Sequence, residues 1–354
     1  MSLLCEHNDS LEIIEDRSGP SLHCGNHFGQ IIQRLESPRN QYPGVAVFCG
    51  STSKHKTLNA VFPKLYPQRR VPAANVQIKL DIRTRSQTSP TIIADIALPP
   101  SKPVGSASAS KQHFPRCAAY PLKWTAPCGA TPFEAVIARL FSSWADAICI
   151  FVDDCGGPDA VAKLLRSWAV LGSNTQQPPT AGPHILIVGS HLAETSLQEF
   201  PHDDTVSAAF ASIQLFDLGK SPNVWTQSDC LKFKERLQQC LHRGRNDRQR
   251  RRLLLSAVHQ GALFAKALTH ISHSLRDPFD IISATRATRT SLQELGHNVQ
   301  QVLTLARQKY IAPDDVYRVI SSALVADALP SGAHGQYPVP LFMYTNQCSS
   351  VSTR

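Results

Sequence analysis

Short apolar runs alternate with amphipathic stretches between residues 45 and 218, which is typical of an α/β domain. Apolar runs bounded by polar residues, Gly or Pro predict strands, and apolar positions three and four apart predict helices that cover a sheet. The predicted strands are residues 45–49, 76–84, 91–98, 147–153, 184–189 and 211–218. Two helices are expected between them: one opens on a capping box from Thr131 to Glu134, and one begins at Pro158.

The pattern becomes helical throughout after residue 228, with helices expected near 228–242, 248–273, 291–309 and 313–328. We therefore predict an α/β sheet domain followed by an all-α C-terminal module. The expected parts of the chain are a loose leader (1–42), the α/β domain (43–222), the helical module (223–335) and a tail (336–354).

The turn after the first predicted strand holds the main candidate for chemistry. It matches the phosphate-binding pattern G-x-x-x-x-G-K-[ST] at Gly50, Lys56 and Thr57, but His55 replaces the second glycine. In such a loop backbone N–H groups surround a phosphate, the lysine bridges phosphates and the hydroxyl coordinates Mg²⁺. Because glycine lets the backbone approach the phosphate closely, an imidazole competes for that space. The pattern therefore predicts a degenerate nucleotide site.

The order of elements after this turn resembles the core of P-loop GTPases, and Asp95 lies where an aspartate would hold magnesium through water. We expect Asp95 to lie near Lys56. Two further parts are missing: Leu98 replaces the glycine of D-x-x-G, and no [NT]-K-x-D motif follows Gly189. We therefore predict a degenerate P-loop GTPase-like sheet with flanking helices. In the plainer alternative, Lys56 and Thr57 are the first turn of a surface helix.

Other polar residues are expected to be structural. Asp153 and Asp154 precede two glycines and a proline at a strand end, so we expect them to cap or form a turn. The histidines and cysteines near the N-terminus lack the paired spacing of a zinc finger, so no metal is predicted. Ten cysteines without a C-x-x-C pair, and an N-terminus without a signal-like apolar segment, favour reduced thiols and a cytoplasmic location.

The net charge of +9 is concentrated near residue 248, where six arginines lie among residues 242–252. No aromatic residues interleave with them for base stacking, which argues against a nucleic-acid partner. We favour a solvated helix start or loop, with peripheral contact to an anionic membrane from Arg243 to Arg252 as an alternative. No apolar run reaches about 18 residues, so no membrane-spanning helix is expected.

Four segments carry a family resemblance: AICIFVDDCGGPDAVAKLLRSWA, RRRLLLSAVHQGALFAKALTHI, PFDIISATR and LVADALPSGAH. They resemble the N-terminal region of large fungal patatin-like phospholipase proteins, over about residues 45–335. In that family a P-loop-like region and a helical segment precede a separate catalytic patatin domain. The resemblance implies phosphate contacts at Gly50, Lys56 and Thr57, and it implies that the chain is a truncated product or a free-standing relative of that region.

The marks of a patatin catalytic module, D-G-G-G-x-R and G-x-S-x-G, do not occur in the sequence, which argues against lipase activity. We interpret the chain as a non-catalytic regulatory or protein-interaction module on a degenerate P-loop NTPase-like domain. It would bind a protein partner and need no cofactor. The alternatives are a weak GTP- or ATP-binding protein or an active P-loop NTPase, each with a Mg-nucleotide, and an accessory part of a patatin-type acyl hydrolase.

Overall fold

The sheet and its helices come from a computed structural model of the whole chain. It describes residues 10–16, 19–63, 65, 75–98, 118–127, 130–172, 182–190, 204–218, 226–251, 253–277, 279, 281, 284 and 292–328. The chain forms two units, Met1–Phe279 and Asp280–Arg354. The predicted tail, residues 336–354, lies outside the described residues.

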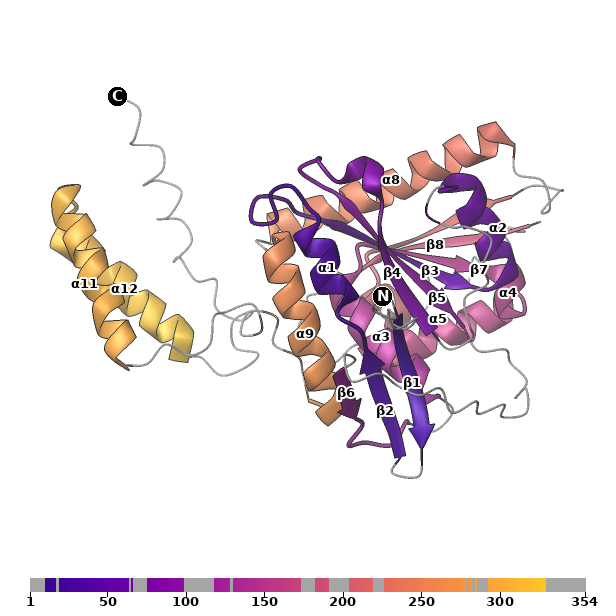
Figure 1. Cartoon of the computed structure of the whole chain (residues 1–354), viewed down its shortest axis with the longest axis horizontal. Coiled ribbons are helices and arrows are strands. Elements are labelled where there is room, and N and C mark those ends of the chain that lie inside the picture. The colour runs from indigo at the N-terminus through magenta and orange to yellow at the C-terminus, as the bar shows by residue number, and fades with distance from the viewer. Residues whose placement is uncertain are drawn as a thin grey trace, which may run out of the picture. The chain divides into compact units, whose positions relative to one another are not determined.

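A mixed sheet forms the centre of the first unit, and among the described residues its strand order is β6-β2-β1-β4-β5-β3-β7-β8-β9 (Figure 1). One half is parallel: β3 (Gly44–Gly50), β5 (Thr91–Ala97), β7 (Ala147–Phe151), β8 (His184–Gly189) and β9 (Ser212–Asp217). The other half joins β5 in antiparallel pairs: β4 (Asn75–Leu80), β1 (Ser10–Asp16), β2 (Gly19–Cys24) and β6 (Ala118–Pro121). The α/β class predicted from the alternating pattern is confirmed.

Alternate residues of the central strands point to opposite faces, so each face needs its own cover of helices. On one face α2 (Thr52–Val61) and α8 (Gln227–Arg250) pack on the sheet through apolar side chains. This core includes Phe48 of β3, Leu58 of α2 and Phe233 of α8, all fully buried. Its inward residues lie within β3, β5, β7 and β8, so the same strands that form the core also end beside the predicted loop.

A second layer of helices joins α3 (Pro132–Trp144), α5 (Pro158–Gly172), α1 (His27–Gln33) and α9 (Ala257–His273). Phe28, Trp144 and Phe264 bring α1, α3 and α9 together, with ring centroids 4.8–4.9 Å apart. The predicted capping box is present: Thr131 accepts a hydrogen bond from the Glu134 N–H, and Glu134 accepts one from the Thr131 N–H. Two short helices, α4 (Val152–Cys155) and α7 (Asp204–Ala209), complete the described helices of this unit along with the single turn η1 (Ile82–Thr84).

The prediction of a loose leader over residues 1–42 is wrong for residues 10–16 and 19–42, the part that the structure describes. Strands β1 and β2 extend the sheet and α1 packs beside it, with Leu11 and Leu22 buried. Each of these elements is six or seven residues long. A segment of this length shows little hydrophobic periodicity, so the sequence pattern does not reveal it. Pairing of β1 with β4 stabilises these strands in the folded protein.

The expected helical module starting at residue 223 is also divided differently. Helices α8 and α9 belong to the first unit, because α8 buries Phe233 and Leu237 in the core of the sheet. The helix expected over 248–273 is two segments, since α8 continues to Arg250 and α9 begins at Ala257. In the second unit α11 (Leu292–Gln308) and α12 (Pro313–Ala328) contact each other. Their bounds agree closely with the predicted ranges, 291–309 and 313–328. None of the described helices is both long enough and apolar enough to cross a membrane.

Candidate functional site

The connection after β3 is much shorter than the turn from Gly50 to Thr57 that the phosphate-binding pattern predicts. Strand β3 ends at Gly50 and helix α2 begins at Thr52, so Ser51 alone separates them. Lys56 and Thr57 therefore lie inside α2 and not on a loop. The Thr57 side chain is buried, and its hydroxyl donates a hydrogen bond to the Ser53 carbonyl at 2.9 Å, within the same helix.

The lysine that meets Asp95 is Lys54, and this corrects the expectation for Lys56. Lys54 Nζ lies 2.6 Å from Asp95 Oδ1 and also donates to the Ile96 carbonyl at 2.6 Å. Both side chains are almost fully buried, with 3% of the Lys54 and 0% of the Asp95 side chain exposed. Lys56 is two residues further along α2, which rotates it by about 200° around the helix axis, and it is exposed.

The free N–H groups at the start of α2 bind the carboxylate of Asp154, which lies on α4 directly after β7. Asp154 Oδ2 accepts from the Ser51 N–H at 2.7 Å and from the Lys54 N–H at 2.9 Å, and Oδ1 accepts from the Ser53 N–H at 2.8 Å. The start of a helix carries unpaired donors and partial positive charge, which is why such sites attract phosphates. Here a carboxylate of the protein itself binds these donors.

Gly50 is required for this arrangement because α4 approaches it closely. A Cβ atom built on Gly50 would lie 2.7 Å from Asp154 Oδ2 and 3.1 Å from the Phe151 Cβ. A side chain at position 50 would therefore displace the carboxylate from the start of α2. The glycine of the pattern does serve a close approach, but the group that approaches is Asp154.

Asp153 and Asp154 were expected to cap or turn, and Asp154 caps a helix from another part of the chain. Its neighbour Asp153 is exposed and accepts a hydrogen bond from the Ser190 hydroxyl at 3.0 Å. Lys54 and Asp154 are the two residues that sequence reasoning missed at this site. One signal could have indicated Lys54: it is the first lysine after Gly50, and it lies in the first turn of the helix that follows.

Two cysteines adjoin this cluster, and their thiols are protonated at neutral pH. Burial raises the pKa of Cys49 well above its ordinary value, and burial together with the charge of Asp154 raises the pKa of Cys155 to about 12. A nucleophile or metal ligand must be a thiolate, so neither cysteine is prepared for that role. Across the part of the chain that the structure describes, no three His, Cys, Asp or Glu side chains are grouped as a metal site.

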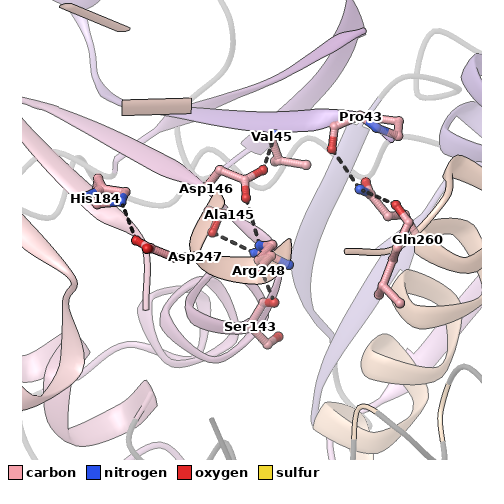
Figure 2. A network of polar contacts seen from close by, with 10 residues as sticks. Pro43, Val45, Ser143, Ala145, Asp146, His184, Asp247, Arg248 and Gln260 are labelled. Carbon is pink, nitrogen blue, oxygen red and sulfur yellow. Dashed lines mark hydrogen bonds and ion pairs between the residues drawn. The ribbon is translucent and has the colours of Figure 1, made fainter. Parts of the chain in front are cut away.

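A second polar network joins α8 to the sheet near the start of β7 (Figure 2). Arg248 Nε lies 2.7 Å from Asp146 Oδ1, and its Nη2 donates to the Ala145 carbonyl at 2.9 Å. Asp146 Oδ2 accepts from the Val45 N–H at 2.8 Å. Burial raises the pKa of Asp146, and the Arg248 charge offsets part of that rise. Arg248 is therefore part of the buried structure. This corrects the expectation of a solvated helix start or loop, because residues 243–250 form the last turns of α8.

His184 lies beside this network at the start of β8. Its Nε2 is 3.4 Å from Asp247 Oδ2, and its Nδ1 is within hydrogen-bond distance of the Ser212 hydroxyl at 2.8 Å. Burial lowers the pKa of His184, and this effect outweighs the opposing charge of Asp247. On the other side, Gln260 of α9 donates to the Pro43 carbonyl at 2.8 Å, directly before β3. These contacts join α8 and α9 to the starts of β3, β7 and β8, so the role of the network is structural.

Comparison with protein-family models gives no match for this chain, and comparison with the curated proteins gives none either. The function is therefore inferred from the chain's own residues.

Proposed function

We propose that this chain is a non-catalytic regulatory or protein-interaction module, built on a degenerate P-loop NTPase-like domain that needs no cofactor. The observation that carries the proposal is the Asp154 carboxylate, which accepts the Ser51, Ser53 and Lys54 N–H groups at 2.7–2.9 Å. These are the donors that a phosphate would use at the start of a helix. The domain would then contribute its surface, and not a reaction, to a complex with another protein.

The order of the strands supports the kinship with P-loop domains. Six strands follow the order β4-β5-β3-β7-β8-β9, with β4 antiparallel to β5 and the other neighbours parallel. This order resembles that of P-loop GTPases, with the candidate loop directly after the central strand β3. In this proposal the loop has been shortened until α2 begins almost at the end of the strand.

The charges at the site support the loss of nucleotide binding. The lysine that would neutralise phosphates, Lys54, is neutralised by Asp95 and nearly buried. A nucleotide would have to displace Asp154 and separate this pair while two carboxylates repel its phosphates. An active NTPase would need Lys54 and the start of α2 free for the phosphates, so the contacts favour the non-catalytic alternative.

Calorimetry with Mg·GTP and Mg·ATP, followed by a phosphate-release assay, tests the proposal. We expect no micromolar binding and no turnover by the unaltered chain. Lys54→Ala and Lys56→Ala form a matched pair, because Lys54 is buried against Asp95 whereas Lys56 is exposed. Micromolar binding that Lys54→Ala abolishes and Lys56→Ala retains, together with steady turnover, would establish the active NTPase and refute the proposal.

A further inference from the structure

Two loops at one end of the sheet are joined to each other, and each carries exposed arginines. The first, residues 37–43, precedes β3, and the second, residues 81–90, connects β4 to β5. Gln41 holds them together, because its side-chain amide donates to the Arg85 and Gln87 carbonyls, both at 2.7 Å. Arg39 on the first loop and Arg83 and Arg85 on the second are all exposed.

Helix α8 adds a fourth arginine to the same end of the sheet. The Arg245 guanidinium lies over the ring of Tyr42, 6.0 Å from its centroid. Tyr42 belongs to the first loop, and its N–H donates to the Thr88 carbonyl of the second loop at 2.8 Å. We call Arg39, Arg83, Arg85 and Arg245 the arginine patch. It differs from the linear run of residues 243–252, because arginines from three segments contribute.

Three acidic residues lie within three positions of these arginines in the sequence: Glu36, Asp81 and Asp247. Glu36 directly precedes the first loop, and Asp81 begins the second. The Asp81 carboxylate accepts the Arg83 N–H at 3.2 Å, so it caps the turn η1. On α8, Asp247 is two residues from Arg245, and its carboxylate lies 3.4 Å from His184 Nε2 and 3.7 Å from Arg250 Nη1. The four arginines therefore exceed the three carboxylates that are close to them in the sequence, and the patch keeps a net positive charge.

An exposed apolar side chain lies on the second loop, next to Arg83. Ile82 precedes Arg83 in η1, and 66% of it is exposed, the highest value after Tyr310 among the exposed large apolar residues of the described chain. The two loops contain one aromatic residue, Tyr42, and Arg245 already lies over it. An exposed isoleucine on a loop with two exposed arginines can bury its side chain below the headgroups of a bilayer while the arginines contact those headgroups. The two loops offer no further aromatic residue on which bases of a nucleic acid could stack.

We propose that the arginine patch and Ile82 bind the surface of a membrane that contains anionic lipids. The arginines contact the negatively charged headgroups, and Ile82 inserts at the boundary between headgroups and acyl chains. Each arginine near such a surface contributes about 1 kcal/mol, or about a fivefold change in partitioning. Removing three carbons from a fully inserted side chain weakens partitioning roughly 60-fold, and about tenfold when about half of their surface is buried, as expected at the boundary between headgroups and acyl chains. Charge and apolar insertion should therefore both be measurable.

Co-sedimentation of the full chain with lipid vesicles tests this proposal. We expect binding to vesicles of phosphatidylcholine with about 30% phosphatidylserine, and a steep decline of that binding as salt increases. Arg83→Ala with Arg85→Ala should weaken partitioning roughly 25-fold, and Ile82→Ala about tenfold. The matched control, called the α11 control, is Arg307→Ala in the last turn of α11 together with Lys309→Ala just after that helix. Both side chains are exposed, and removing the same charge there should change partitioning less than twofold.

Three results would overturn the proposal. The first is equal binding to vesicles of phosphatidylcholine alone, and the second is a loss in the α11 control as large as in the patch variant. The third is binding to an RNA or DNA oligonucleotide, measured by fluorescence anisotropy, that exceeds vesicle binding and is unaffected by Ile82→Ala. All the substituted side chains are exposed, so we expect each variant to retain its fold. Circular dichroism of each variant checks this.

Discussion

Replacing Asp154 by alanine removes the acceptor for the first turn of α2. Three backbone N–H groups, those of Ser51, Ser53 and Lys54, lose bonds of 2.7–2.9 Å. Ser51, the residue before α2, makes no capping hydrogen bond with its side chain, so the Asp154 carboxylate is the cap of this helix. The variant therefore tests directly whether the carboxylate stabilises the helix.

The expected cost follows from the number of bonds and their exposure. Losing a helix cap costs about 0.5–2 kcal/mol, and a hydrogen bond to a charged group is worth about 1.5–3 kcal/mol. Ser51 is exposed, so water can replace part of what its N–H loses. We expect Asp154→Ala to lower the free energy of unfolding by about 2 kcal/mol, roughly a thirtyfold change in the equilibrium constant.

Urea denaturation followed by tryptophan fluorescence measures this loss, because Trp124, Trp144 and Trp168 lie within the first unit. Asp153→Ala is the matched control: it removes the neighbouring carboxylate, whose side-chain contact is the 3.0 Å bond from Ser190, and should cost less than about 1 kcal/mol. If Asp154→Ala lowers the free energy of unfolding no more than Asp153→Ala does, the Asp154 carboxylate does not stabilise the start of α2. The proposal that it takes the place of a phosphate there is then refuted.

Three further predictions concern buried charges in the first unit. Lys54→Met leaves the Asp95 carboxylate buried without its cation and should lower the free energy of unfolding by about 3–5 kcal/mol. Arg248→Met removes the partner of buried Asp146 and should cost a similar amount, about 3–5 kcal/mol, in the same urea assay. Because burial lowers the pKa of His184, its stabilising effect is present above the unfolded value of about 6.5 and is lost as the pH falls through the folded value. His184→Gln should therefore lose less stability than the unaltered chain between about pH 7.5 and pH 5, measured by urea denaturation at each pH.

Each of these predictions has a control. Lys56→Met and Arg250→Ala remove exposed cations from the same two helices and should each change stability by less than about 0.5 kcal/mol. If Lys54→Met lowers the free energy of unfolding no more than Lys56→Met does, the buried Lys54–Asp95 pair does not stabilise the fold. In the same way, an Arg248→Met effect no larger than that of Arg250→Ala would show that the Arg248–Asp146 pair does not stabilise it. For the pH series, an unchanged slope in His184→Gln would assign the acid loss to other groups.

The periodicity of the sequence was sufficient to predict most of the central sheet and several helices. Apolar runs predicted the positions of β3, β5, β7 and β8, because a strand that is buried on both faces must be apolar along its length. The capping box at Thr131 predicted the start of α3, because both of its hydrogen bonds lie within four residues. Features of this kind depend on neighbours in the chain, and a single sequence contains all of them.

The tertiary structure alone decided which polar groups meet. The N–H groups of α2 and the carboxylate that binds them are 100 to 103 residues apart, and no spacing rule connects Asp154 to Ser51. Lys54 and Lys56 are alike in the sequence, but a rotation of about 200° along the helix buries one against Asp95 and exposes the other. Arg248 likewise differs from the exposed Arg243 and Arg250, because it faces the sheet and binds buried Asp146. Periodicity identifies the faces of elements, but the partner of a polar side chain depends on which elements the fold brings together.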